Sequence, residues 1–170
     1  MLKPFAEYEC LILGCGNSLL GDDGFGPAVI QHLEAHFSLP SSVAAIDCGT
    51  SIRDILFDVL LSPQKPRKII IVDVADRPGL ALGEIREIDI DQIKPEKIAD
   101  FSLHQFPTAN MLKEIKEETP IDGRILVVQA TGLPDEVKPG LSDPVREAIA
   151  PMCERLLSEI GSTPTERRME

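Results

Sequence analysis

The sequence predicts an α/β fold: a three-layer α/β/α sandwich around a mostly parallel, twisted, five-stranded sheet with one antiparallel strand. Two patterns lead to this prediction. Short apolar runs alternate along the chain with longer segments in which apolar residues recur every three or four positions, as in buried strands and amphipathic helices. One other run alternates apolar and polar residues, as a half-exposed antiparallel strand does. Helices that alternate with parallel strands must cover both faces of the sheet.

Four apolar runs are expected to form the parallel strands: residues 10–15, 43–46, 68–74 and 124–130. They are apolar through their centres, as strands buried on both faces are, and KIIIVDV is the richest of them in β-branched side chains. The alternating run, residues 84–88, is expected to be the antiparallel strand at one edge of the sheet.

Four helical stripes lie between and after these strands. The first starts at Phe25 with apolar residues spaced by four, and Asp22 or Asp23 is expected to cap its N-terminus. Pro151 falls inside the last stripe, so a kink or a split is expected there, because proline cannot continue the helical hydrogen-bond pattern. The later stripes lie within residues 52–60, 106–115 and 145–160.

The bulk properties indicate one domain and exclude several classes of partner. In this chain of 170 residues without internal repeats, residues 1–160 are expected to form one domain and the polar residues 161–170 a disordered tail. A net charge of −11 argues against a nucleic-acid partner. Because there is no apolar run of membrane-spanning length and no signal peptide, a cytoplasmic protein without a membrane partner is expected.

The cysteines indicate no zinc ribbon and no redox motif. None of Cys10, Cys15, Cys48 and Cys153 has a C-x-x-C spacing, which excludes the common zinc-ribbon and thioredoxin-like motifs. The first three lie in or at the end of apolar segments, so reduced, buried thiols are expected.

The stretch LILGCGNSLLGDDGFGP, residues 11–27, is the first candidate for chemistry. An apolar strand ends there in a glycine-rich turn and two adjacent carboxylates, Asp22 and Asp23, which repel one another unless they cap a helix or meet a cation. A dinucleotide-binding turn does not fit, because the glycines follow G-x-G-x-x-x-x-G and no acidic residue lies about 20 positions on. No G-x-S-x-G elbow supports a serine nucleophile.

Two more polar residues are expected at the same edge of the sheet. Asp73 lies near the end of the third strand, and His104 precedes a helix. Carboxylates and an imidazole at the carboxyl ends of strands would make a half-filled metal site suited to nickel, zinc or cobalt. The alternatives are structural: a helix cap for Asp23, a hydrogen-bonded acid for Asp73 and a helix-start residue for His104. His32 and His36 also have a metal-pair spacing, but no third ligand lies nearby in the sequence.

Five motifs occur along the chain in the order GCGNSLLGDDGFGP, DCGTS, IIIVDVAD, SLHQ and GLSDPVREAI. Together they resemble the nickel–iron hydrogenase maturation endopeptidases, whose signature is G-x-G-N-x-L-x-x-D-[DE]-G-x-G. The resemblance spans residues 9–160 and implies the same three-layer fold. The SLHQFP segment, with Pro107 where many members have glycine, is similar to the branch that serves coenzyme F420-reducing hydrogenases.

This resemblance implies an endopeptidase, classed as aspartic-type, that removes the C-terminal extension of a hydrogenase large-subunit precursor once nickel is in place. The implied catalytic and metal-binding residues are Asp23, Asp73 and His104, which leaves Asp22 for backbone and cap contacts. They would bind the nickel carried by the substrate, and nickel, cadmium or zinc in the isolated protein. The metal would polarise the scissile region for attack by water, or Asp23 or Asp73 would act as the base.

Two other functions stay open on the sequence. One is a non-catalytic chaperone that only checks the nickel state of its partner, which hydrolysis of a matching precursor would distinguish from the endopeptidase. A nucleoside phosphorylase-like or other hydrolase would need a cationic anion site near the glycine turn, and residues 11–27 contain no Lys or Arg. Family precedent implies a monomer.

Overall fold

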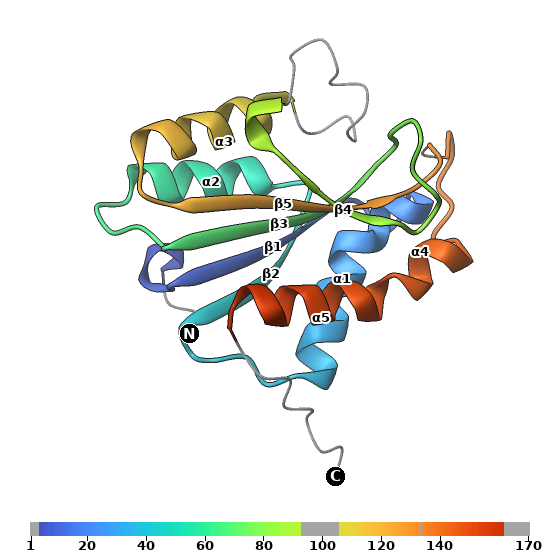
Figure 1. The fold of residues 1–170 in the computed structure, drawn as a ribbon, viewed down its shortest axis with the longest axis horizontal. Helices are drawn as coiled ribbons and strands as arrows, with labels where there is room; N and C mark the ends of the chain where they lie inside the picture. The colour runs from blue at the N-terminus through green and yellow to red at the C-terminus, as the bar shows by residue number, and fades with distance from the viewer. Residues whose placement is uncertain (1–3, 93–105, 133, 162–170) are drawn as a thin grey trace.

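The computed structural model describes residues 4–92, 106–132 and 134–161, which form one five-stranded sheet with helices on both faces (Figure 1). The strand order is β2-β1-β3-β5-β4. β4 pairs antiparallel with β5 and the other pairs are parallel, which confirms the predicted fold class. The strands are β1 (Cys10–Cys15), β2 (Val43–Gly49), β3 (Lys68–Ala75), β4 (Ile85–Ile88) and β5 (Asp122–Gln129).

Two long helices pack on each face of the sheet (Figure 1). α1 (Phe25–His36) and α5 (Ile149–Glu159) cover one face, and α2 (Ile52–Leu61) and α3 (Phe106–Glu118) cover the other. Strand side chains alternate between the two cores, as the pleat requires: Ile69 and Ile71 pack with α2 and α3, whereas Ile70 packs with α1 and α5. The shorter helices include η1 (Phe5–Glu7), η2 (Gly21–Gly24), η3 (Ile90–Gln92) and α4 (Asp143–Glu147).

The predicted break in the C-terminal helix occurs, but at Ala148 instead of at Pro151. A proline ring inside a helix clashes with the carbonyl four residues back, which here belongs to Glu147. α4 accordingly ends at Glu147, and α5 starts at Ile149 with the proline in its first turn.

The carboxyl ends of the parallel strands lie at one end of the sheet, referred to below as the carboxyl rim. β1 has β2 on one side and β3 on the other, so the strand order reverses between β1 and β3. Open α/β sheets bind ligands in the crevice at such a switch point. Asp23 follows β1 and Asp73 lies near the end of β3, so both acids belong to this point.

His104 lies outside the described residues, as do residues 162–170 of the expected tail. Within the described ranges, no helix has the length and apolarity that crossing a membrane requires.

Candidate functional site

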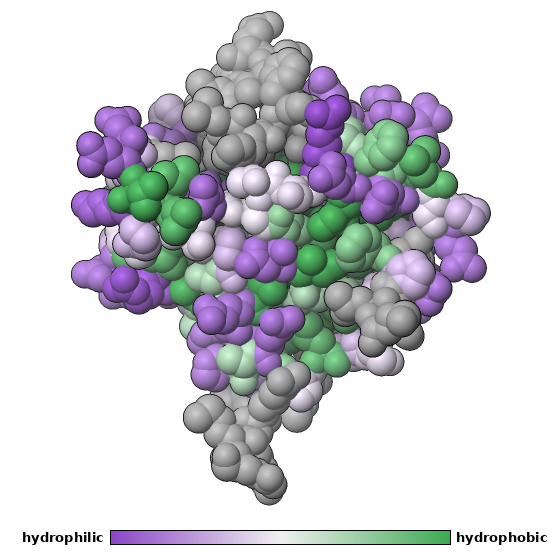
Figure 2. Space-filling model, turned by 180° about the vertical axis from the view of Figure 1, so that it is seen from behind, coloured by the Kyte–Doolittle hydropathy of each residue, from purple (hydrophilic) through white to green (hydrophobic). Residues whose placement is uncertain are grey.

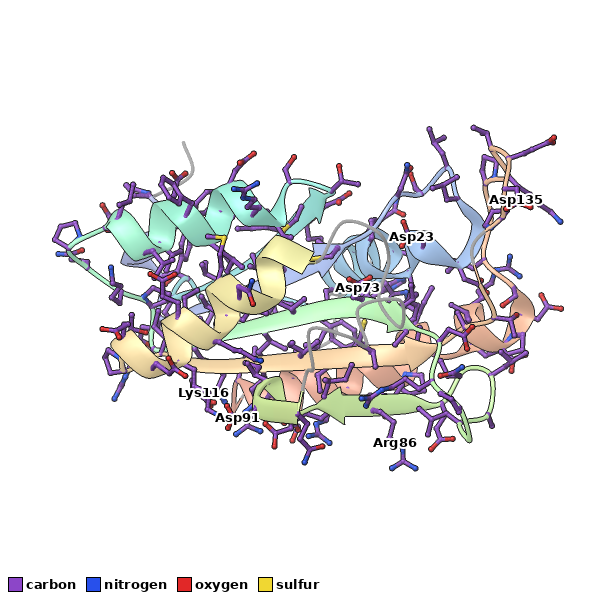
Figure 3. All side chains as sticks on the ribbon, turned by 90° about the horizontal axis from the view of Figure 1, so that it is seen from above. Asp23, Asp73, Arg86, Asp91, Lys116 and Asp135 are labelled. Atoms are coloured by element: carbon purple, nitrogen blue, oxygen red, sulfur yellow. The ribbon has the colours of Figure 1, made fainter. Side chains whose placement is uncertain are left out.

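Among the described residues, the buried polar side chains are those of Asp23, Asp73 and Gln129. Figure 3 shows the two acids at the same end of the sheet. Gln129 has a structural role, because its amide nitrogen donates to Asp76 Oδ1 at 3.0 Å and its amide oxygen accepts from the backbone N–H of Arg77 at 2.9 Å. It ties the loop after β3 to the end of β5. This residue was not predicted, because its only signal in the sequence is a polar side chain at the end of an apolar strand.

Asp23 is positioned by the glycine turn. Its side chain is fully buried, and Oδ2 accepts a hydrogen bond from the backbone N–H of Asn17 at 2.8 Å. Gly16 lies against it with a φ of +132°, and a Cβ at that position would lie 1.8 Å from the carbonyl oxygen of Asp23. Only glycine permits both this φ and this approach. The signature glycine and the acid therefore form one structural unit.

The start of α1 packs just as closely on the sheet. A Cβ on Gly26 would lie 2.2 Å from the carbonyl oxygen of Cys15 in β1 and 2.7 Å from that of Val72 in β3. Because no side chain separates helix from strands here, α1 begins directly over the junction of β1 and β3. The preceding η2 turn, which contains Asp23, is thereby held at the switch point.

Asp22 has a different role from its neighbour. The expectation that Asp22 or Asp23 caps α1 is wrong, since both acids lie in η2 and Gly24 is the N-cap. Asp22 instead accepts hydrogen bonds from the backbone N–H of Ser142 at 2.6 Å and from its hydroxyl at 2.8 Å. Ser142 is the N-cap of α4, so Asp22 holds the start of a helix that is distant in sequence.

Asp73 is a buried acid, and one of its two carboxylate oxygens has no hydrogen-bond partner among the described residues. Oδ1 accepts from the backbone N–H of Val74 at 2.8 Å, whereas Oδ2 has no hydrogen-bond partner within the described part of the chain. Burial raises the pKa of Asp73 well above its ordinary value against the opposing bond from Val74, and the nearby charge of Asp23 raises it further. This carboxyl group therefore favours a proton or a cation.

The helix that follows His104 can be placed although His104 itself lies outside the described residues. α3 ends shortly before β5, whose first residue, Asp122, pairs with Lys68 at the start of β3. A helix of 13 residues is about 20 Å long, so the first turn of α3 lies toward the carboxyl rim (Figure 1). α3 covers the face of the sheet on which Asp73 lies.

Asp23 and Asp73 do not by themselves make a complete metal site. In the part of the chain that the structure describes, no group of three or more His, Cys, Asp or Glu side chains is arranged to hold a metal ion. Any ion bound at the two acids needs further ligands from outside this set.

A buried thiol, Cys15, interacts with the acids, and a second, Cys48, interacts with Cys15. Cys15 ends β1 and Cys48 lies near the end of β2, and all four cysteines are free and buried, which confirms the prediction. A hydrogen bond with Cys48, burial and the negative charge of Asp73 raise the pKa of Cys15 well above its ordinary value. Cys15 therefore stays a neutral thiol. Its position beside Asp73 has no local sequence signal, because the two residues come from different strands.

A groove of about 470 Å³ opens beside the η2 turn. Gly21 and Gly24, on either side of the acid pair, are among the residues that line the groove. Its wall includes Pro27, Ile30 and Glu34, which share one face of α1. The surface next to Asp23 thus offers room for a short stretch of extended polypeptide.

A doubly wound sheet with buried acids at its switch point defines an α/β protein whose ligand site lies at the carboxyl rim. The chain belongs to the hydrogenase maturation protease family, because the family model matches residues 27–159. The protein is therefore a hydrolase of the endopeptidase class. This result decides against the chaperone and the phosphorylase-like hydrolase that the sequence left open.

Similar proteins support this assignment. A relative from Methanocaldococcus jannaschii, whose name describes a hydrogenase maturation protease, is 37% identical over 91% of this chain and 97% of its own length. Coenzyme F420 hydrogenase subunit delta from Methanothermobacter thermautotrophicus is 34% identical over 91% of this chain and 96% of its own. The hydrogenase maturating endopeptidase HybD from Escherichia coli has a similar structure, with a TM-score of 0.73 and 27% identity over 94% of this chain and 98% of that one.

Proposed function

We propose that this endopeptidase removes the C-terminal extension from the large-subunit precursor of a nickel–iron hydrogenase after nickel has been inserted. Membership of the hydrogenase maturation proteases supports the reaction and the class of substrate. The buried acid pair at the switch point is the observation that supports the location of the site. The similarity to coenzyme F420 hydrogenase subunit delta supports a coenzyme F420-reducing hydrogenase as the source of the precursor.

Asp23 and Asp73, with His104 as a third ligand, bind the nickel that the precursor carries. Carboxylate oxygens and an imidazole nitrogen suit first-row divalent ions. The raised pKa of Asp73, caused by burial and by the charge of Asp23, makes this a poor place for two negative charges without a cation. A divalent ion offsets both charges at once. Nickel binding therefore favours the deprotonated form of Asp73.

The nickel belongs to the substrate, so holding it also positions the scissile peptide bond. Two carboxylates and an imidazole leave coordination positions for ligands that the precursor supplies. Water then attacks the peptide carbonyl next to the ion, and one carboxylate takes a proton from that water and passes it to the amine that leaves as the C–N bond breaks. A precursor without nickel lacks the cation that the acids require and is not held.

The protein acts as a monomer in the cytoplasm under this proposal. Four free and buried cysteines suit a reducing compartment.

The test is cleavage of a purified precursor, either loaded with nickel or free of it, followed by mass spectrometry. The wild-type protein is expected to shorten only the nickel-loaded form. Asp23→Asn, Asp73→Asn and His104→Ala each remove a ligand, so cleavage is expected to slow by at least about 100-fold, the upper end of what loss of an outer-shell partner costs.

Asp54→Asn and His36→Ala are matched controls, because both side chains are exposed on outer helix surfaces. They are expected to cleave at the wild-type rate. Equal cleavage of loaded and nickel-free precursor contradicts nickel recognition, and wild-type rates in all three site variants contradict the site. Calorimetric titration with Cd²⁺ measures metal binding separately from cleavage.

A further inference from the structure

Large apolar side chains are exposed at five described positions: Leu19, Phe57, Leu61, Leu82 and Val137. Single exposed residues of this kind are ordinary, whereas clustered ones mark binding surfaces. Figure 2, turned by 180° from Figure 1, shows several groups of hydrophobic residues, and one of them lies at the left, the end of the molecule at which Figure 1 draws α4 on the right.

Leu19 and Val137 lie side by side although they are distant in sequence. The backbone N–H of Lys138 donates to the carbonyl of Leu19 at 2.9 Å, and the N–H of Gly21 donates to the carbonyl of Lys138 at 2.8 Å. These two bonds form a parallel bridge between Leu20 and Lys138, which places Leu19 opposite Val137. Both side chains are exposed, Leu19 by 51% and Val137 by 69%, and because their backbones are adjacent they are referred to below as one apolar pair.

This apolar pair is tied to the acids of the candidate site. The backbone N–H of Leu19 donates to Asn17 Oδ1 at 3.0 Å, and the N–H of Asn17 donates to Asp23 at 2.8 Å. The other segment is anchored where Asp22 accepts the two hydrogen bonds from Ser142. Both halves of the apolar pair therefore have a fixed position relative to the acid pair.

We propose that Leu19 and Val137 dock an apolar surface of the hydrogenase precursor beside its nickel-bearing region, an inference that rests on the proposed function. Burial of apolar side chains at the centre of a contact contributes much of the binding free energy between proteins. The precursor is favoured over a second copy of this chain because the apolar pair is linked through Asn17 to the acids at which the nickel of the precursor is proposed to bind.

The test compares Leu19→Ser, Val137→Ser and the double variant with Phe57→Ser and Leu61→Ser. The controls are matched in exposure, at 55% and 69% against 51% and 69%, but lie on α2. All four side chains are exposed, so the melting temperature is expected to stay at the wild-type value. The double variant is expected to raise KM for nickel-loaded precursor about tenfold with unchanged kcat, and to weaken precursor binding by the same factor. The controls are expected to change neither quantity.

The outcomes separate this inference from the proposed function. If the wild-type protein cleaves and the double variant has the KM and affinity of the controls, the inference is overturned and the proposed function stands. If the wild-type protein does not cleave, the proposed function fails, and the binding measurement alone still supports or overturns the docking role. A wild-type dimer in sedimentation that the double variant loses assigns the pair to self-association and overturns the inference.

Discussion

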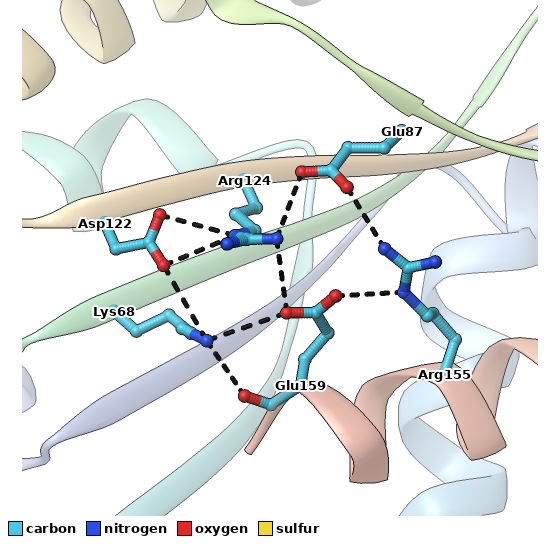
Figure 4. A network of polar contacts seen from close by, with 6 residues as sticks. All are labelled: Lys68, Glu87, Asp122, Arg124, Arg155 and Glu159. Atoms are coloured by element: carbon cyan, nitrogen blue, oxygen red, sulfur yellow. Dashed lines mark hydrogen bonds and ion pairs between the residues drawn. The ribbon is translucent and has the colours of Figure 1, made fainter. Parts of the chain in front are cut away.

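The two ends of the sheet differ in how their charged side chains are arranged: opposite charges are paired at one end, and two like charges are buried at the other. At the amino ends of the strands, three cations and three anions form one ion-pair network (Figure 4), in which Glu159 alone contacts Lys68 at 3.6 Å, Arg124 at 3.4 Å and Arg155 at 2.9 Å. At the carboxyl rim, two groups of the same sign, Asp23 and Asp73, are fully buried, and the charge of one raises the pKa of the other.

This contrast separates charge that supports folding from charge that opposes it. The network connects the end of α5 to β3, β4 and β5 through Lys68, Arg124 and Glu87. Each charged side chain in it contacts at least one side chain of the opposite charge. The buried acids oppose folding, because desolvation and like charge both disfavour ionised carboxylates. Perturbed acids of this kind concentrate at functional sites. The charges at one end therefore stabilise the fold, and we propose that those at the other end bind a cation.

The largest effect is expected from Asp73→Asn, which removes the charge of this carboxylate and keeps the shape of the side chain. Cleavage is expected to fall by at least about 100-fold, while the melting temperature of the metal-free protein rises, because a neutral amide avoids the cost of a buried carboxylate. Cleavage assays and calorimetry measure the two effects. A variant that loses stability as well as activity would show that the carboxylate supports the fold.

The stability gap between Asp73→Asn and the metal-free wild type should widen with pH. The folded-state pKa of Asp73 is raised above its ordinary value of 3.8, so its stabilising contribution is complete below that value and is lost as pH rises through the folded-state pKa. Each unit by which the pKa is raised corresponds to about 1.4 kcal/mol. Urea unfolding between about pH 4 and pH 8 measures the gap. A constant gap would contradict the buried-acid assignment.

A smaller effect is expected from Gly26→Ala at the switch point. The new Cβ would lie 2.2 Å from the carbonyl oxygen of Cys15, so α1 must shift, at a cost of about 1–3 kcal/mol in the free energy of unfolding. Gly123→Ala at the amino end of β5 is the control, because its Cβ would meet Ile90 Cδ1 at an ordinary 3.5 Å. Equal denaturation midpoints for the two variants would show that close packing at the carboxyl rim is not required.

The smallest effect is expected from Glu159→Gln in the network. The substitution removes the charge shared by three cations, which should cost about 1 kcal/mol of stability at low salt and less in about 1 M salt, because screening weakens partly exposed pairs. Cleavage should not change. Glu118→Gln, at an exposed position of α3, is the matched control. A salt-independent loss would point to packing of the side chain as the cause.

Most of the fold was predictable because its signals are local. Apolar runs and helical spacing located every strand and long helix of the described residues within a few positions. The predicted second strand was too short: β2 continues to Gly49, with Cys15 of β1 paired to that glycine beyond a register shift. The last residues of β2 cannot be recognised from its own sequence, because the polar Asp47 interrupts the apolar pattern. They belong to the strand because β1 pairs with them.

The sequence by itself determined the α/β architecture, the glycine signature that carries Asp23, and the position of Asp73 at the end of a buried strand. Tertiary structure decided that Asp22 binds the start of α4, that Cys15 and the acids share one electrostatic environment, and that two loops present Leu19 beside Val137. The reason is physical. Periodicity and turn chemistry act over a few residues, whereas burial, charge coupling and bridge pairing depend on segments that meet only in the folded chain.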